Sequence, residues 1–290
     1  RFCTLFQTIW YFCSKYPEMV IFPKAKINLG LRITARRPDG FHDIETIFYP
    51  VGLCDILEMT VNDDKKGKDI FSLSGLGLDA DQDGNLVIKA VRKLREAYDL
   101  PPLKIHLHKI IPPGTGLGGG SSDAAGALRT MNRVFELALS AQELKTIALD
   151  LGSDCPFFID CQPAFATGRG ENLRQVDAVL EGLYIVLVNP GIPISTREAY
   201  LKCSPSKTGV NLSELIHYPV AEWKSHIIND FEKTVFEQYP QIGIIKRVLY
   251  NNGALYSSMS GSGSAVYGIY ADKPEIPEIL RDYVIYKGIL

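Results

Sequence analysis

The chain has 290 residues, of which 46% are hydrophobic and 22% are charged, and its formal net charge is −2 at pH 7. This length predicts about two domains that each bury a core, and the composition is that of a globular protein. A nearly neutral chain without a long basic segment has no strong attraction for polyanions. We therefore expect no nucleic acid and no membrane among its partners.

Residues 1–18 are rich in aromatic side chains and precede Met19. Their apolar run is interrupted and has no clear small-residue cleavage site, unlike a secretory signal, so we expect an extension outside the fold. No other window approaches the length of apolar sequence that a transmembrane helix needs. The six cysteines are scattered and lack metal-site spacing, which is typical of reduced thiols in a cytoplasmic protein.

The first part of the chain after Met19 reads as strands followed by helices. Strand patterns occupy residues 20–22, 27–33, 41–49 and 56–61, and a turn at 37–40 makes the second and third of them antiparallel partners. A charged turn is expected at residues 62–69. This order of elements predicts an α+β layout on a mostly antiparallel sheet.

Two helices in this part have recognisable caps. The first is predicted over residues 85–98, after a cap at 83–85. The second follows a capping box made by Ser140 and Glu143, and it ends near residue 150, before Gly152.

The second part of the chain, from about Phe165, repeats this mixture. A buried strand is predicted at 183–190, and helices are predicted from Asn229 and over 242–251. Residues 254–270 read as two strands around a Gly-Ser turn. We therefore expect a second α+β domain.

The glycine-rich segment 112–122 is the most informative stretch of the sequence. A strand pattern at 103–107 precedes it, and a helical stripe that includes Leu128 and Met131 follows it. Its glycines let the backbone approach a ligand closely. Free amides and the positive end of a helix dipole then meet at one place, which predicts a phosphate-binding site.

Two known phosphate-binding patterns describe this segment poorly. Residues 114–119 satisfy the dinucleotide pattern, but Glu136 falls inside the following helix instead of ending a second strand. No lysine precedes Ser121 or Ser122, which argues against a P-loop. A flexible linker is a further alternative, although linkers seldom separate a strand from an amphipathic helix.

Four segments, in this order, resemble the GHMP small-molecule kinases. They read PKAKINL at 23–29, PPGTGLGGGSS at 112–122, LGSDCPFF at 151–158 and MSGSGS at 259–264. The resemblance implies a two-domain α+β architecture, with an ATP-binding domain at 19–164 that is like domain 2 of ribosomal protein S5. It also implies a ferredoxin-like C-terminal domain at 165–290.

The resemblance implies phosphoryl transfer from ATP to a hydroxyl of a small molecule. It makes Asp154 the base that accepts the hydroxyl proton, and Lys26 the cation that keeps Asp154 ionised and stabilises charge in the transfer. Mg²⁺ is expected on the ATP phosphates, with Ser122 as a candidate ligand and no evident acidic one. The residues expected to bind ATP are Pro112, Pro113, Gly114, Thr115, Gly116, Leu117, Gly118, Gly119, Gly120, Ser121 and Ser122, with Asn85 and Lys109 on the side of the adenosine.

Residues 39–42, Asp-Gly-Phe-His, are similar to the family members that act on 4-diphosphocytidyl-2-C-methyl-D-erythritol. This implies a cytidine diphosphate-linked methylerythritol as substrate, phosphorylated at position 2 in the non-mevalonate isoprenoid precursor pathway. Two aromatic rings would sandwich the cytosine and a histidine would read its edge. Phe41 stands where these members usually have tyrosine, so the stacking face is kept and the hydroxyl is lost. The residues expected to bind this substrate are Asn28, Phe41, His42, Thr196 and Tyr200.

Other readings stay open at this point. The chain could be another GHMP kinase, acting on homoserine, mevalonate or a sugar, or a homologue that binds nucleotide without turnover. The presence of both Lys26 and Asp154 favours an enzyme. The sequence is compatible with a monomer or a homodimer.

Overall fold

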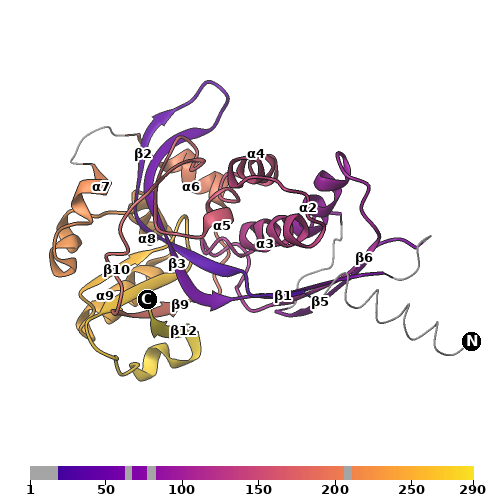
Figure 1. Ribbon diagram of the computed structural model, residues 1–290. Coiled ribbons are helices and arrows are strands. Elements are labelled where there is room, and N and C mark those ends of the chain that lie inside the picture. The colour runs from indigo at the N-terminus through magenta and orange to yellow at the C-terminus, as the bar shows by residue number, and fades with distance from the viewer. Residues whose placement is uncertain (1–18, 63–66, 77–82, 206–210) are drawn as a thin grey trace, which may run out of the picture. The chain divides into compact units, whose positions relative to one another are not determined.

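The computed structural model describes residues 19–62, 67–76, 83–205 and 211–290, which divide into two compact units (Figure 1). The predicted extension at residues 1–18 lies outside the described residues. Unit 1 contains the described residues up to Pro23, Cys54–Ile111 and Gly119–Asp160. Unit 2 contains Lys24–Leu53, Pro112–Gly118 and Cys161–Leu290. The chain therefore passes between the units several times.

Unit 1 contains a four-stranded sheet in the order β1-β4-β6-β5. The pairs β1–β4 and β4–β6 are antiparallel, and β5–β6 is parallel. Leu57 and Met59 on β4 lie opposite Leu107 and Ile105 on β6, and all four side chains are buried. One face of the sheet is therefore apolar, as the alternating pattern predicted. The strands are β1 (Met19–Ile21), β4 (Ile56–Val61), β5 (Ile70–Gly75) and β6 (Leu103–Lys109).

Strand β5 is not among the predicted strands. Three of its six residues are Ser72, Ser74 and Gly75, so the sequence lacks a run of β-branched or aromatic residues. As the edge strand it leaves part of its surface exposed, which lowers its demand for apolar side chains. Part of the charged turn predicted next to it, at 63–66, lies outside the described residues.

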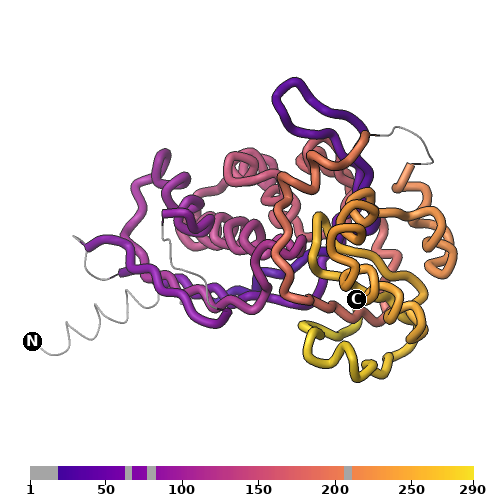
Figure 2. The backbone as a smooth tube through the Cα atoms, turned by 180° about the vertical axis from the view of Figure 1, so that it is seen from behind, coloured from indigo at the N-terminus to yellow at the C-terminus, as the bar shows by residue number. Residues whose placement is uncertain are grey.

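The helices of unit 1 gather beside this sheet, as both views show (Figures 1 and 2). Helix α3 packs against α2, α4 and α5 and against strands β1 and β4. Both predicted caps are confirmed: Asn85 accepts a hydrogen bond from the amide of Val87, and Ser140 and Glu143 form a complete capping box. The helices are α2 (Leu86–Arg95), α3 (Gly119–Val134), α4 (Ala141–Leu151) and α5 (Phe157–Asp160).

Unit 2 contains two four-stranded sheets, in the orders β2-β3-β7-β8 and β10-β11-β9-β12. The strands β2 and β3 form the predicted hairpin, with the amide of Arg37 donating to the carbonyl of Phe41 at 2.8 Å. This hairpin is the indigo loop at the top of Figure 2. The strands are β2 (Lys24–Arg36), β3 (His42–Cys54), β7 (Ala164–Thr167), β8 (Asn172–Gln175), β9 (Tyr184–Val188), β10 (Tyr256–Met259), β11 (Val266–Tyr270) and β12 (Val284–Ile289).

The helices of unit 2 share one apolar core with its strands. This core joins Leu31 and Ile33 of β2 and Ile44 of β3 to Val186 of β9 and Phe231 of α8. The unit is therefore mixed helix and strand like the first, and the predicted α+β class is confirmed. The helices are α6 (Thr196–Lys202), α7 (Leu212–Leu215), α8 (Phe231–Gln238), α9 (Pro240–Asn251) and the 3₁₀ helices η1 (Val220–Ser225) and η2 (Glu278–Tyr283).

The predicted helices from 229 and over 242–251 correspond to α8 and α9. The short elements β7, β8, β12, α6 and α7 are not among the predictions. Over the described ranges, no helix combines the length and the apolar character needed to span a bilayer.

Candidate active site

The glycine-rich loop 112–118 is fixed within unit 2 through its carbonyl groups. The carbonyl of Thr115 accepts from the amide of Ala265 at 3.2 Å, and that of Leu117 accepts from the amide of Lys26 at 2.9 Å. The carbonyl between them, of Gly116, accepts from the Ser260 hydroxyl at 2.8 Å. Within the described part of the chain, the amides of 116–118 donate no hydrogen bond, so they are available to a ligand.

Glycine is required at position 116 for two reasons. The φ angle of Gly116 is +80°, in the left-handed region. A Cβ atom at this position would lie 1.9 Å from the carbonyl oxygen of Ser260. Two of the four motif segments, 112–122 and 259–264, therefore contact each other backbone to backbone.

The continuation of this loop forms the first turn of α3 in unit 1. Gly119, Gly120, Ser121 and Ser122 occupy this turn, which contains no acidic residue. The first amides of a helix have no partner inside the helix, and the dipole adds positive potential there. The predicted strand, loop and helix arrangement is thus present, and it is suited to an anion.

Asp154 lies in the turn between α4 and α5 of the same unit and is half-buried. Ser121, in the first turn of α3, is hydrogen-bonded to the neighbouring thiol of Cys155. Burial raises the pKa of Cys155 to about 11, so this thiol is neutral at physiological pH. The turn that carries Asp154 is therefore adjacent to the first turn of α3.

Lys26 lies on β2 in unit 2, and only 3% of it is exposed. Its ammonium donates to Asn28 Oδ1 at 2.6 Å and lies 4.9 Å from the centre of the Phe48 ring. The Asn28 amide in turn donates to the Thr46 hydroxyl at 2.9 Å. Because it is buried, Lys26 is not an ordinary solvent-exposed lysine on a strand. A buried ammonium favours the approach of an anion.

Ser260 is a residue of this region to which the sequence analysis gave no role. Its hydroxyl accepts from the amide of Asn28 at 3.3 Å and donates to the carbonyl of Gly116. The glycine-rich loop and the Lys26–Asn28 pair therefore share one buried hydroxyl. Its place in the MSGSGS segment was the available signal, but the partners of that segment cannot be read from the sequence.

The predicted cytosine-binding residues lie on the surface of unit 2. The rings of His42 and Tyr200 are stacked, with centroids 5.0 Å apart and planes 20° apart. Phe41 is 52% exposed, so it is not a core residue. The guanidinium of Arg169 lies 4.8 Å from the Phe41 ring centre. Arg169 was missed by the sequence analysis, and a single arginine in a turn carries no recognisable signal.

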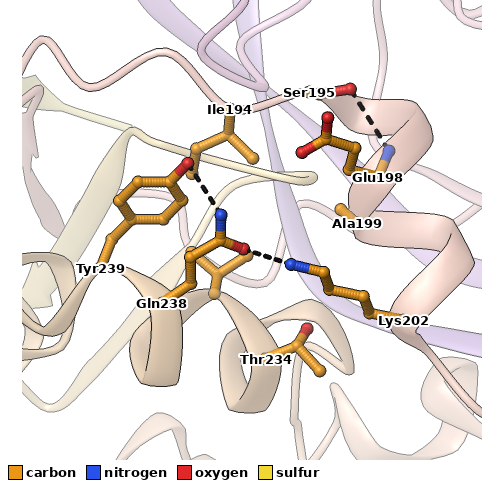
Figure 3. A pocket seen from close by; sticks show the side chains of 9 residues that line it. Ile194, Ser195, Glu198, Ala199, Lys202, Thr234, Gln238 and Tyr239 are labelled. Atoms are coloured by element: carbon orange, nitrogen blue, oxygen red, sulfur yellow. Dashed lines mark hydrogen bonds between the residues drawn. The ribbon is translucent and has the colours of Figure 1, made fainter.

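Thr196 begins α6, and its hydroxyl lies 2.9 Å from that of Ser262. A small pocket lies between α6 and α8, and none of the predicted site residues lines it (Figure 3). Three of its polar side chains are hydrogen-bonded to one another: Lys202 donates to Gln238, which donates to the Tyr239 hydroxyl. This pocket is therefore not the predicted substrate site.

The two residues predicted beside the adenosine both have partners inside unit 1. The side-chain oxygen of Asn85 caps α2. The ammonium of Lys109 forms ion pairs with Asp55 and Asp123. Burial raises the pKa of Asp123 to about 7, against the opposing effect of Lys109.

Comparisons with known proteins agree on one family. The model of the GHMP kinases N terminal domain matches residues 85–162, and the model of the GHMP kinases C terminal domain matches residues 219–285. A 4-diphosphocytidyl-2-C-methyl-D-erythritol kinase from Parabacteroides distasonis is 46% identical, over 94% of this chain and 100% of its own length. A protein of the same name from Azobacteroides pseudotrichonymphae is 50% identical, over 89% of this chain and 96% of its own.

Solved structures give the same result. A crystal structure of 4-(cytidine 5'-diphospho)-2C-methyl-D-erythritol kinase matches with a TM-score of 0.71 and 30% identity, over 87% of this chain and 90% of that one. Homoserine kinase from Cytophaga hutchinsonii matches with a TM-score of 0.65 and 17% identity, over 88% and 86%, which shows a shared fold. With relatives of this identity over nearly its whole length, the chain belongs to the GHMP kinase family of ATP-dependent small-molecule kinases.

Proposed function

We propose that this kinase transfers the γ-phosphate of ATP to the 2-hydroxyl of 4-diphosphocytidyl-2-C-methyl-D-erythritol. The observation that carries the proposal is the glycine-rich loop, held by its carbonyls at 115–117 and leading directly into α3. The identity of the acceptor is supported by the relatives at 46% and 50% identity that have this name.

The amides of 116–122 bind the triphosphate of ATP in this proposal, without a lysine in the loop. A Mg²⁺ ion on the phosphates would neutralise part of their charge. Such an ion would be held mainly by phosphate and water oxygens, and Ser122, in the first turn of α3, is the candidate protein ligand. No cluster of three acidic, histidine or cysteine side chains is found among the residues described.

Asp154, in its half-buried turn, accepts the proton of the attacking hydroxyl, since a carboxylate can serve as the general base of such a transfer. Lys26 stabilises the negative charge that develops during transfer. An ammonium that is already buried and held by Asn28 needs no reorientation as that charge appears. Pre-oriented charge of this kind is the main protein contribution to phosphoryl transfer.

The cytosine ring stacks on the exposed face of Phe41, and His42, Tyr200, Asn28 and Thr196 complete the acceptor site. The stack of His42 on Tyr200 supports a role for Tyr200 in orienting the imidazole. The thiols of Cys155 and Cys203, which form no disulfide, support a cytoplasmic location. We expect the enzyme to act as a monomer or a homodimer.

The first experiment measures ADP release with a panel of acceptors. We expect turnover with the cytidylated methylerythritol and none with methylerythritol, homoserine or mevalonate. Equal rates with the unmodified polyol would overturn the acceptor assignment, and turnover with homoserine or mevalonate would favour another GHMP kinase activity.

The second experiment tests the base. Asp154→Asn should lower kcat by at least about 100-fold and leave ATP affinity nearly unchanged, because the amide cannot accept the proton. Asp160→Asn is the matched control, since this exposed carboxylate in the neighbouring helix pairs with Lys145. Full activity of the Asp154→Asn variant would show that Asp154 is not the base.

The third experiment tests the stacking. Phe41→Ala should raise KM for the cytidylated acceptor by about 5- to 100-fold, because stacking on a base contributes about 1–3 kcal/mol. Phe41→Tyr should leave that KM close to the original value. Phe22→Ala is the control, because it removes a similarly exposed aromatic ring from unit 1. It should change neither KM for ATP nor KM for the acceptor. An unchanged acceptor KM in Phe41→Ala would remove Phe41 from the site.

A further inference from the structure

Three charged side chains form a buried triad in unit 1, next to both ends of the glycine-rich loop. The Lys109 ammonium donates to Asp55 and, at 2.7 Å, to Asp123. The exposed fractions of Lys109, Asp55 and Asp123 are only 4%, 0% and 2%. Lys109 is predicted to lie beside the adenosine, but these partners direct its ammonium toward the interior of unit 1.

Asp55 holds the segment that enters the loop. Its second carboxylate oxygen accepts from the amide of Ile110 at 2.6 Å and from that of Ile111 at 2.8 Å. These are the last two residues before Pro112, where the loop begins. One carboxylate therefore fixes the backbone direction at the loop entrance.

Asp123 and Gly119 bring the triad to the segment that leaves the loop. Asp123 lies on α3, one residue after Ser122. A Cβ atom at Gly119 would lie 3.2 Å from the Lys109 ammonium and 2.9 Å from Ile111. The Lys109 ammonium and the Ile111 side chain therefore both lie against Gly119, in the first turn of α3.

Stability alone does not explain this triad. Two carboxylates share one ammonium, and Asp123 Oδ1 has no hydrogen-bond partner among the described residues. A buried carboxylate oxygen without a partner costs free energy. Buried ion pairs can often be replaced by apolar side chains without loss of stability. An arrangement that a stable core does not need points to another role.

We propose that the Asp55–Lys109–Asp123 triad positions the phosphate-binding loop, by fixing residues 109–111 at its entrance and 119–123 at its exit relative to each other. The proposal deepens the proposed function and rests on it, because the loop is taken as the site for the ATP phosphates. Lys109 is in this view a positioning residue without contact to the nucleotide. Displacement of loop amides by about 1 Å is enough to impair a phosphoryl-transfer site strongly.

The test compares Asp123→Asn with the double variant Lys109→Met/Asp123→Leu. The asparagine keeps an oxygen that can accept from Lys109, so KM for ATP and kcat should stay within about threefold of the original values. The double variant replaces the ion pair between Lys109 and Asp123 by two apolar side chains. It leaves the Asp55 carboxylate without its ammonium, held only by the amides of Ile110 and Ile111, so it should fold with a lower free energy of unfolding. In the folded protein KM for ATP should rise at least about 10-fold, kcat should fall, and KM for the acceptor should be unchanged.

Lys145→Met/Asp160→Leu is the matched control, because it removes another ion pair of unit 1, between α4 and α5. It should change neither kcat nor KM for ATP. If Lys109→Met/Asp123→Leu does not fold, Asp123→Ala, which leaves Lys109 paired with Asp55, is measured in the same way and decides. An ATP KM within twofold of the original value in the folded variant would overturn the proposal, as would equal losses in the control.

Calorimetry measures the affinity for a non-hydrolysable ATP analogue without any turnover. It therefore tests the positioning role of the triad separately from the proposed acceptor and reaction. If the original chain binds the analogue but does not phosphorylate the cytidylated acceptor, the proposed function fails. The weaker binding expected for the double variant then still supports the positioning role, and equal binding overturns it. A chain that does not bind the analogue at all would overturn both.

Discussion

At the scale of single residues, position 116 tolerates substitution least among the loop residues. Gly116→Ala combines a positive φ with a Cβ atom that would lie 1.9 Å from the Ser260 carbonyl oxygen. The loop must therefore move, and we expect KM for ATP to rise at least about 10-fold. Gly182→Ala has a similar φ of +84° with nothing within 4 Å, so it separates backbone strain from the clash. Equal effects of the two variants in a kinetic assay would contradict this account.

A second residue-scale prediction concerns Asp230, whose carboxylate accepts from the amide of Ile33 at 2.8 Å. Burial raises the pKa of Asp230 above its ordinary value, although the hydrogen bond from Ile33 and the charge of Arg32 oppose this. The folded state therefore binds the proton more tightly than the unfolded state. The resulting stabilisation is present below the ordinary pKa and is lost as pH rises through the raised one.

Urea unfolding of the original chain and of Asp230→Asn between about pH 4 and pH 7 checks this sign. The asparagine oxygen still accepts from Ile33 but does not ionise. The original chain should lose stability relative to the variant as the pH rises. A difference that is constant over this range would show that the pKa of Asp230 is the same in the folded and unfolded states, and a difference of opposite sign would show that folding lowers it; either result would contradict the prediction.

At the scale of elements, capping decides where α4 begins. The Ser140 hydroxyl accepts from the amide of Glu143, and the Glu143 carboxylate accepts from the amide of Ser140. Ser140→Ala should lower the free energy of unfolding by about 1 kcal/mol, because one helix amide loses its partner. Thr146→Ala, in the interior of the same helix, should change it by less than about 0.5 kcal/mol. Equal urea midpoints for both variants would contradict the importance of the cap.

Elements with such local signals were predictable from the sequence. The caps of α2 and α4, the turn at 37–40 and the alternation in β4 and β6 depend on residues within a few positions of one another. The edge strand β5 and the short strands β7 and β8 were missed. Whether these residues form strands depends on pairing with a neighbouring strand that is far away in the sequence, β6 for β5 and β3 for β7.

At the scale of the whole molecule, the units are built from separate segments of the chain. The core of unit 2 includes Leu31, Ile33 and Ile44, which precede the rest of that core by more than a hundred residues. A fragment of residues 165–290 lacks these side chains and also β3, the strand that pairs with β7. We expect this fragment not to fold. Circular dichroism and the dispersion of amide proton chemical shifts in an NMR spectrum check this. A cooperative thermal transition of the isolated fragment would contradict this prediction.

The sequence by itself determined the α+β class, the capped helices and the family, because these depend on local spacing and on four segments that keep their order. The tertiary structure decided the partners of the site residues. Ser260 meets Asn28 across 232 positions of the chain, Lys109 meets Asp55 across 54, and the ring stacked on Tyr200 is His42. Such contacts depend on the path of the backbone through the sheets, which no short pattern of residues encodes.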